Sequence, residues 1–461
     1  MKTLSFAPFL LCLIPILTFT QCRNVDPKSP KAEGFDPPIP SPVSYLAGPI
    51  TFQLRDLEGK INQELDPVLI GKGSSSGRIG GAFPFRVTRS GRVRIQYVNQ
   101  QVRFSTPLQL WIVRPFSQSK TIEGKPFCSL QINFQSPLNV TPDWRLASQV
   151  RFIDYNWVIK PEIRVLGREI SLENLIRKLL ENYQPAIESA IDGAVGKQLR
   201  LDQLITPVWM DLQKPLLLDR QYGLWLLPKP MAIESSPISG NARQLTTHIR
   251  IALKSETVLS DRQPPYKPTP LPTLQKRDQI EETSDLQLMS FIPYTDINRV
   301  LDRTFNKKST KLAFGALTIK KTSVYGGQNS LIVKAEVSGL LDGTVYLRGR
   351  PAFDTVTNTL GVKNLDFDAQ TNDVVPNLMG WLIHDSLIKV IGKLVTLPLG
   401  NEIAQLPTTI NEALKKGEAG KKVELNIQDF RFTPKTIAIR PDGLQTLIRV
   451  QSKLGVNIKK L

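Results

Sequence analysis

The sequence contains very little histidine and cysteine, with two histidines and three cysteines in 461 residues. So few histidines, with no Cys or His set at metal-ligand spacing, argue against a metalloenzyme or a histidine-dependent hydrolase. Three cysteines also exclude a disulfide framework as the source of stability. One of them, Cys128, lies in a predicted strand, where a free cysteine behaves as a small hydrophobic residue. We therefore expect a non-enzymatic protein without a metal or a cofactor.

The sequence also lacks the usual signals for binding nucleotides or nucleic acids. Gly71 to Gly77 is rich in glycine and serine, but it has neither the Gly-Lys-Ser/Thr ending nor the following helix of a phosphate-binding loop. We interpret it as a flexible loop. Lys and Arg outnumber Asp and Glu by 59 to 41, which gives a net charge of +18. These charges form no compact cluster of the nucleic-acid-binding type, so we expect no nucleic-acid partner.

The N-terminus has the features of an export signal. Residues 1–21 form a nonionic stretch rich in Leu, Ile and Phe after a single charge, which is typical of a secretory signal peptide. Cys22 follows and begins a proline-rich tether over residues 22–43. This arrangement resembles a bacterial lipoprotein signal, in which a diacylglycerol is joined to the cysteine thiol, although Phe19 and Gln21 depart from the usual residues. The resemblance implies an exported protein anchored through Cys22 to the outer membrane and facing the periplasm. Ordinary signal cleavage nearby and an uncleaved anchor are the alternatives.

The basic charge has two explanations for an exported protein. A protein tethered to a bacterial envelope with this charge is expected to lie against an anionic membrane surface. The arginines are nonetheless spread along predicted strands, where they would simply form the solvated face of a sheet.

An internal repeat organises the chain. The segment Ile50 to Leu65 recurs 240 residues later at Ser290 to Phe305, with Asp56 matching Asp296. In each copy, alternating apolar residues give way at the aspartate to apolar residues four apart, which predicts a strand that leads into a helix. Many short alternating runs follow in both copies and predict a strand-rich α+β protein.

A long amphipathic helix is predicted near the end of each copy. In the first, apolar residues recur at steps of three and four over residues 172–195, after Ser171 as the N-cap, and Pro185 is expected to bend or break the helix. The counterpart runs from Pro376 to Pro398. The apolar faces of these helices supply the candidates for lipid contact, and packing against a sheet is the alternative role of each. The candidates are Leu175, Leu179, Ile187, Ile191, Leu382, Ile388 and Ile391.

Two groups of acidic and histidine residues were weighed as catalytic candidates. Asp366 and Asp368 stand two apart on a predicted strand and so share a face, which we interpret as a solvated edge. His384 and Asp385 are adjacent on the second long helix, where neighbours point about 100° apart, so we expect no dyad between them. His248 has no acidic partner nearby in the sequence.

A family resemblance rests on glycines and prolines in the second copy. The order of Gly339, Gly343, Tyr346, Gly349 and Pro351 resembles the bacterial family catalogued as domain of unknown function 4403, over residues 44 to 461. These motifs identify a course of the backbone and no chemistry, so the resemblance implies no functional residues.

The duplicated plan also resembles the tubular lipid-binding superfamily, which includes the bactericidal permeability-increasing proteins. There, each half wraps a long, curved antiparallel sheet round a long helix, and acyl chains lie between them. The resemblance implies two similar half-domains of this kind at residues 44–255 and 285–461, joined by a proline-rich connector at 256–284. It implies a protein that binds or carries a lipid or other amphiphile in an apolar groove. A structural or interaction protein with filled cores, contacting anionic envelope components, is the alternative.

Overall fold

A computed structural model describes the chain from residue 24 to residue 459 with several gaps. The described residues are 24–71, 77–79, 83–112, 124–166, 168–198, 200–220, 223–304, 308–312, 315–339, 341–374 and 380–459. The predicted signal peptide, Cys22 and most of the glycine-rich loop lie outside them. The fold is α+β and dominated by antiparallel strands, as the sequence predicts. No helix among the described residues is both long enough and apolar enough to cross a membrane.

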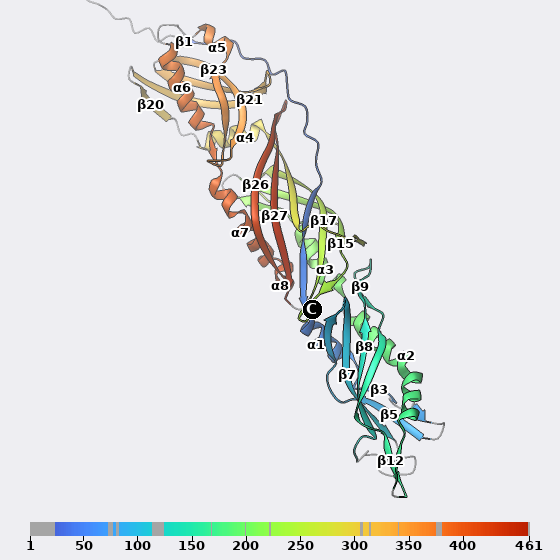
Figure 1. Ribbon diagram of the computed structural model, residues 1–461. Coiled ribbons are helices and arrows are strands. Elements are labelled where there is room, and N and C mark those ends of the chain that lie inside the picture. Colours follow the sequence, from blue (N-terminus) through green and yellow to red (C-terminus); the bar gives the residue numbers. More distant parts are fainter. Residues whose placement is uncertain are drawn as a thin grey trace, which may run out of the picture.

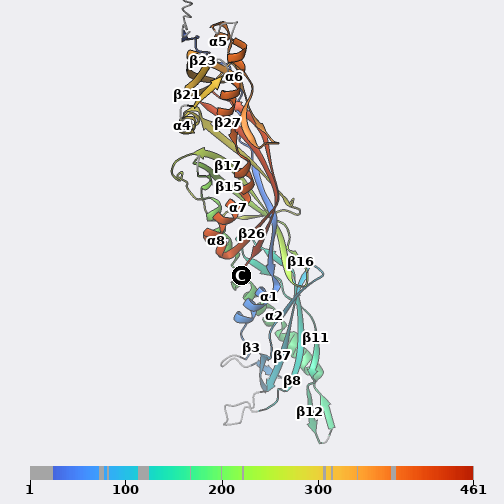
Figure 2. The same cartoon turned by 90° about the vertical axis from the view of Figure 1, so that its left-hand side faces the viewer.

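The molecule is elongated, with three sheets arranged one after another along its length (Figures 1 and 2). We call the seven-stranded sheet at one end, with the helices on it, the first body, and the seven-stranded sheet at the other end the last body. A nine-stranded central sheet lies between them.

The first body carries helices α1 (Leu54–Glu64) and α2 (Glu173–Gln198) on one face of its sheet. Its strand order is β11-β8-β7-β5-β3, with β4 paired to β5 and β6 to β7. The strands are β3 (Val68–Ile70), β4 (Gly77–Ile79), β5 (Phe83–Arg89), β6 (Arg94–Val98), β7 (Gln101–Ile112), β8 (Cys128–Ser136) and β11 (Arg151–Ile159). Two hairpins, β9 (Leu138–Val140) with β10 (Leu146–Ser148) and β12 (Glu162–Val165) with β13 (Arg168–Ser171), extend from it.

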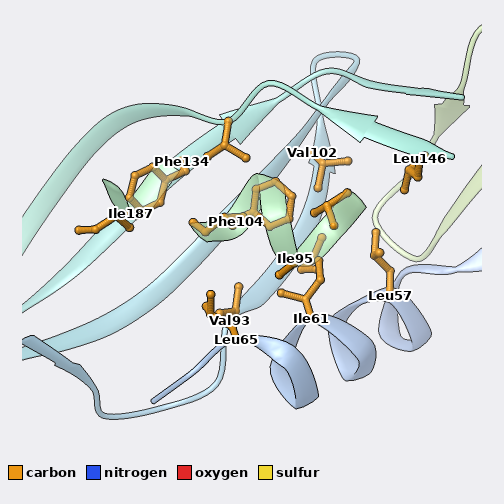
Figure 3. Packing of buried hydrophobic residues seen from close by; sticks show 14 of the residues in the cluster. Leu57, Ile61, Leu65, Val93, Ile95, Val102, Phe104, Phe134, Leu146 and Ile187 are labelled. Carbon is orange, nitrogen blue, oxygen red and sulfur yellow. The ribbon is translucent and has the colours of Figure 1, made fainter. Parts of the chain in front are cut away.

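The core of the first body is built from the inward faces of these strands and helices (Figure 3). β7 alternates buried and more exposed residues along its length, so Phe104, Leu108 and Leu110 all point inward. Cys128 is free and fully buried, and burial raises the pKa of its thiol to about 12. This confirms that Cys128 acts as a hydrophobic core residue.

The long helix α2 is a single element. Ser171 Oγ accepts a hydrogen bond from the N–H of Glu173 (3.4 Å), as expected for the predicted N-cap. Pro185 lies inside the helix and does not end it, so the predicted break is wrong. A proline removes one backbone hydrogen bond, but Ile187 and Ile191 beyond it are buried against the sheet and hold the second half in place.

The last body repeats this plan with helices α4 (Tyr294–Thr304), α5 (Ala369–Val374) and α6 (Gly380–Leu394). Its strand order is β20-β21-β22-β23-β24-β25, and β1 (Asn24–Val25) joins β23 in parallel. The strands are β20 (Lys308–Leu312), β21 (Gly315–Gly327), β22 (Ser330–Gly339), β23 (Asp342–Asp354), β24 (Thr359–Phe367) and β25 (Leu397–Pro398). Leu387 and Ile391 of α6 are fully buried against this sheet.

The central sheet combines strands from both ends of the chain, in the order β14-β15-β17-β19-β2-β27-β26. The strands are β2 (Ser44–Gln53), β14 (Leu216–Asp219), β15 (Leu224–Ser235), β16 (Ser239–Gly240), β17 (Gln244–Leu259), β18 (Leu274–Lys276), β19 (Thr283–Pro293), β26 (Val423–Ile439) and β27 (Gly443–Ile458). Helices α3 (Leu201–Leu212), α7 (Gly400–Lys416) and α8 (Glu418–Lys422) accompany it.

The repeat found in the sequence is present in the order of these elements. α1 and α4 have the same length and begin 240 residues apart, each directly after a strand, which confirms the predicted strand-to-helix opening. Further along, β17 and β27 have equal lengths and begin 199 residues apart, as α3 and α7 do. Tyr45 and Asp285, which are 240 apart, pair with each other across the central sheet. Corresponding strands of the two copies therefore meet at this pair.

The proline-rich connector runs without helix or strand over residues 260–273. Two indole N–H groups hold it against the protein. Trp144 Nε1 donates to the carbonyl oxygen of Pro272 (2.7 Å), and Trp209 Nε1 donates to that of Thr269 (2.9 Å).

The N-terminal proline-rich segment is also attached to the protein (Figure 1). Asp36 exchanges backbone and side-chain hydrogen bonds with Ile439, and its carboxylate lies 3.1 Å from Arg350 Nη2. The carbonyl oxygen of Pro30 accepts a hydrogen bond from the hydroxyl of Tyr325 (3.0 Å). From residue 24 onward, this segment is therefore fixed along the last body and the central sheet.

Candidate functional site

The predicted lipid-contact residues of α2 mostly face the first-body core. Leu179, Ile187 and Ile191 are buried, and Ile187 lies beside Phe134 (Figure 3). Leu175 is 42% exposed near the start of the helix. Three of these four side chains are therefore covered by protein atoms.

The candidates on α6 are arranged in the same way. Ile391 is fully buried and Ile388 is partly buried, and both pack in the core of the last body. The side chain of Leu382 lies outside the described residues. The described candidates thus form the packed seam between each long helix and its sheet.

A cavity of about 520 Å³ opens between the C-terminal half of α2 and the β9–β10 hairpin. Its volume lies within the range of typical small-molecule sites. The lining combines apolar, small and charged residues, namely Thr141, Asp143, Arg145, Leu146, Ala147, Ser148, Asp192, Gly193, Gly196 and Arg200.

One wall of the cavity is formed by two glycines of α2. Gly193 and Gly196 are three residues apart and so lie on the same face of the helix. A Cβ atom at either position would meet no other atom within 4 Å. The cavity therefore exists where the otherwise apolar face of α2 has no side chains to fill the space, and Leu146 and Ala147 line it from the hairpin.

Charged groups line the other part of the cavity. Arg145 Nε lies 3.1 Å from Asp143, and Arg200 makes two hydrogen bonds, of 2.8 and 2.6 Å, to Asp202. The hydrogen bonds from Arg200 lower the pKa of Asp202. Both arginine side chains remain partly exposed, at 54% and 39%. Such guanidinium groups can donate to the oxygens of a phosphate or carboxylate that enters the cavity.

Acidic residues of α2 hold the neighbouring edge strand in place. Glu188 and Asp192 fall on the helix face that the sequence assigns to solvent, but Glu188 is 8% exposed. Its carboxylate accepts the backbone N–H of Phe152 (2.8 Å), and Asp192 accepts that of Val150 (3.1 Å). These side chains satisfy backbone donors at the edge strand β11, which explains why they are turned inward.

The acidic and histidine candidates differ from the sequence prediction. His384 Nδ1 lies 3.0 Å from Asp385 Oδ1 and Nε2 lies 2.6 Å from Asp366 Oδ1, so the expectation of no contact between His384 and Asp385 is wrong. The 100° separation describes the Cα–Cβ directions, and side-chain rotation brings the two polar atoms together. His248 also finds an acidic partner, because Nε2 lies 3.4 Å from Glu282, which is distant in sequence.

Asp368 is not at a solvated edge, as was predicted for it and Asp366. The strand β24 ends at Phe367, and Asp368 lies at the start of α5 with 2% exposure. Its Oδ2 accepts the backbone N–H of Gln370 (3.1 Å), which is the role of a helix cap. Asp366 remains 64% exposed, in agreement with the prediction.

The chemistry of this cluster favours a structural role for His384. Both ring nitrogens face carboxylates, and the hydrogen bonds to Asp366 and then Asp385 raise the pKa of the imidazole. A general base needs an imidazole nitrogen that is free to accept a substrate proton. The cluster instead fastens α6 to β24, with the ring of Phe367 packed edge-on against the imidazole.

We expect His384 to titrate above the ordinary histidine pKa, and the Asp366→Asn variant to bring that pKa back toward 6.5. A raised folded-state pKa means that the ion pairs contribute stability below about pH 6.5, which is lost as the pH rises through the folded-state pKa. The contribution should be below about 1 kcal/mol because the carboxylates are largely exposed. NMR titration of the imidazole resonances checks the pKa, with His248 as an internal reference, and an unchanged pKa in Asp366→Asn would contradict the assignment.

The cavity residues were missed in the sequence, although part of the signal was present. The pair Gly193 and Gly196 interrupts an apolar helix face at a spacing of three, and this gap could have been noticed. Arg145 and Arg200 could not have been joined from sequence, because they meet through an isolated backbone bridge between separate elements.

Comparisons with known proteins support the family resemblance. No curated protein matches the chain. Among solved structures, the chain is similar to a crystal structure of lipopolysaccharide binding protein with 11% sequence identity and a TM-score of 0.34, covering 92% of this chain and 100% of that one. The model of the family described as domain of unknown function (DUF4403) matches residues 42–458, which is most of the chain. The protein therefore belongs to the DUF4403 family.

Proposed function

We propose that this protein is a non-enzymatic envelope lipoprotein that binds an amphiphile with an anionic head and an apolar tail. The binding site is the cavity between α2 and the β9–β10 hairpin. The observation that carries the proposal is that this single cavity brings exposed guanidinium groups beside an apolar wall. We further propose that Cys22 carries the lipid anchor and that the protein faces the periplasm from the outer membrane.

The architecture supports this proposal. The element offsets of 240 and 199 residues are what two similar half-domains would give, each with an antiparallel sheet against a long helix. This plan resembles that of the tubular lipid-binding superfamily, and a curved sheet on a long helix offers a long apolar seam. Fold likeness alone is a weak argument for function, so the cavity carries the proposal.

The energetics favour a ligand with an apolar tail. Burial of an acyl chain is worth about 0.8 kcal/mol per methylene, without any specific polar motif. The head group would be fixed by hydrogen bonds from Arg145 and Arg200, which are stronger than neutral ones because they are charge-assisted. From the cavity, the tail would follow the apolar face of α2, where Ala194 and Ile191 begin the packed seam.

We expect the purified chain without residues 1–22 to carry about one amphiphile per molecule, and the Gly193→Leu variant to lose most of it, roughly tenfold or more. Leucine at this position fills the cavity without a clash and raises helix propensity, so folding should be preserved. Organic extraction followed by mass spectrometry measures the ligand, and a fluorescent fatty acid measures uptake.

Gly59→Leu is the matched control for this experiment. Gly59 also lies on a helix, α1, and a Cβ atom there would meet nothing within 4 Å, but it does not line the cavity. This variant should keep the ligand. A wild-type protein that contains no ligand and takes up no fatty acid, or equal losses in the two variants, would refute the proposed site.

A specific observation favours the alternative of a structural or interaction protein with filled cores. Leu179, Ile187, Ile191 and Ile391 are buried among protein side chains, so a tail can enter the seam only by replacing these contacts. In that case the basic surface would contact anionic envelope components, and the extraction would recover no stoichiometric lipid.

A further inference from the structure

The start of the described chain is fixed at the outer end of the last body. Asn24 pairs with Asp342 and Val25 pairs with Gly343 at the beginning of β23. Val25 is 2% exposed and belongs to the core of the last body. The φ of Gly343 is +125°, and a Cβ atom there would overlap the carbonyl oxygen of Val25, so the glycine permits this close approach.

This docking determines where an anchor at Cys22 would lie. Cys22 stands two residues before Asn24, and two residues of extended chain span about 7 Å. The hydrogen bonds of Asp36 hold the following segment against the central sheet and the last body. A lipid on Cys22 would therefore place a membrane beside the β1 end of the molecule, and not beside the opposite end.

The opposite end of the molecule is the β12–β13 hairpin (Figures 1 and 2). Leu166, at the turn of this hairpin, is 99% exposed. Five of the thirteen exposed large hydrophobic side chains among the described residues fall within residues 158–175. They are Val158, Ile159, Leu166, Ile170 and Leu175, and we call them the apolar tip.

The shape and charge of the apolar tip fit a lipid surface. A two-stranded hairpin projects from the body, whereas a site for a small apolar ligand is concave. Isolated exposed apolar residues are common, but a cluster at one end of a molecule marks an interaction site. Five basic residues accompany three acidic ones within residues 158–178, and Arg168 is exposed beside Leu166. Basic groups that flank protruding apolar side chains are suited to an anionic bilayer.

We propose that this protein bridges two membranes, with the lipidated Cys22 in one and the apolar tip inserted into the surface of a second, anionic phospholipid bilayer. The inference rests on the anchor in the proposed function, and it does not depend on the cavity. The two attachment points lie at opposite ends of an elongated molecule, so they cannot both enter the same flat bilayer while the molecule stands upright on it.

Vesicle clustering tests this proposal. The full lipidated chain is inserted through its anchor into neutral phosphatidylcholine vesicles, which are mixed with vesicles containing phosphatidylglycerol, and clustering is followed by light scattering. We expect the wild-type protein to cluster the vesicles and the double variant Leu166→Asp, Ile170→Asp to reduce clustering at least tenfold. Val356→Asp is the matched control, because Val356 is 90% exposed at a turn of the last body. It should cluster vesicles as the wild type does.

The full-length Cys22→Ser chain separates failure of the tip from failure of the anchor. It should float with anionic vesicles through the tip, lose flotation in the double variant, and cluster nothing. Absence of clustering by the wild type, or equal loss in Val356→Asp, would overturn the bridge. Mass spectrometry showing no lipid on Cys22 of the cell-made protein would overturn both the bridge and the proposed anchor. Amphiphile binding in the cavity would be unaffected by that result.

Discussion

The Gly48→Ala variant should be destabilised by about 3 kcal/mol or more, one of the largest effects available to a single methyl group in this protein. Gly48 lies in β2, where a Cβ atom would overlap the carbonyl oxygen of Leu454 in β27. β2 cannot move aside, because it pairs with β17 along its whole length and meets β27 at Ile50. The added methyl group must therefore separate strands at the centre of the molecule.

Denaturant unfolding followed by tryptophan fluorescence and far-UV circular dichroism would measure the shift in midpoint. Gly59→Ala serves as the control, since Gly59 lies on α1 in open space. There, alanine should stabilise the protein by up to about 1 kcal/mol through helix propensity. Similar midpoints for the two variants would contradict the close approach of β2 and β27.

The location of Gly48 also shows which parts of the fold are visible in the sequence. The opening strand and helix of each copy could be predicted, because alternation and four-residue spacing are local properties of Ile50 to Leu65 and Ser290 to Phe305. The long helix α2 was predicted for the same reason. Its continuation through Pro185 was not, since tertiary packing of Ile187 and Ile191 outweighs a local rule.

The central sheet could not be predicted from local pattern. β2 pairs with β17, about 200 residues away, and touches β27 and β19 near its middle and start. Strand partners at such separations are determined by the fit of whole faces, so one strand's alternation names no partner. The exchange of strands between the two copies is therefore known only from the structure.

The candidate site was predictable only in part. The apolar residues on α2 and α6 were found from periodicity, and their burial agrees with a face turned toward a sheet. The cavity depends instead on missing side chains at Gly193 and Gly196 and on Arg145 and Arg200 from neighbouring elements. The links from His384 to Asp366 and Asp385 likewise depend on rotamers and on tertiary approach, which spacing does not define.

The Phe134→Ala variant is expected to lose about 3–5 kcal/mol of stability, the typical cost of removing a fully buried phenylalanine ring. Phe134 has no exposed surface, stands opposite Phe104 in the β7–β8 pair, and packs edge-on against Phe152 with centroids 6.0 Å apart. It also lies against Ile187 of α2 (Figure 3). The empty space would therefore open directly beneath the helix.

The matched control is Phe353→Ala in the last body, because Phe353 is only partly buried and should cost clearly less. Denaturant midpoints compare the two variants, and uptake of the fluorescent fatty acid is measured on each. If the seam beneath α2 can receive a tail, Phe134→Ala should take up more of the probe, because the new cavity is apolar and continuous with the packed face of the helix. A loss of stability below about 1 kcal/mol in Phe134→Ala would mean that this ring does not hold α2 against β8. The packed seam, on which both the lipid-binding proposal and the filled-core alternative depend, would then be wrong.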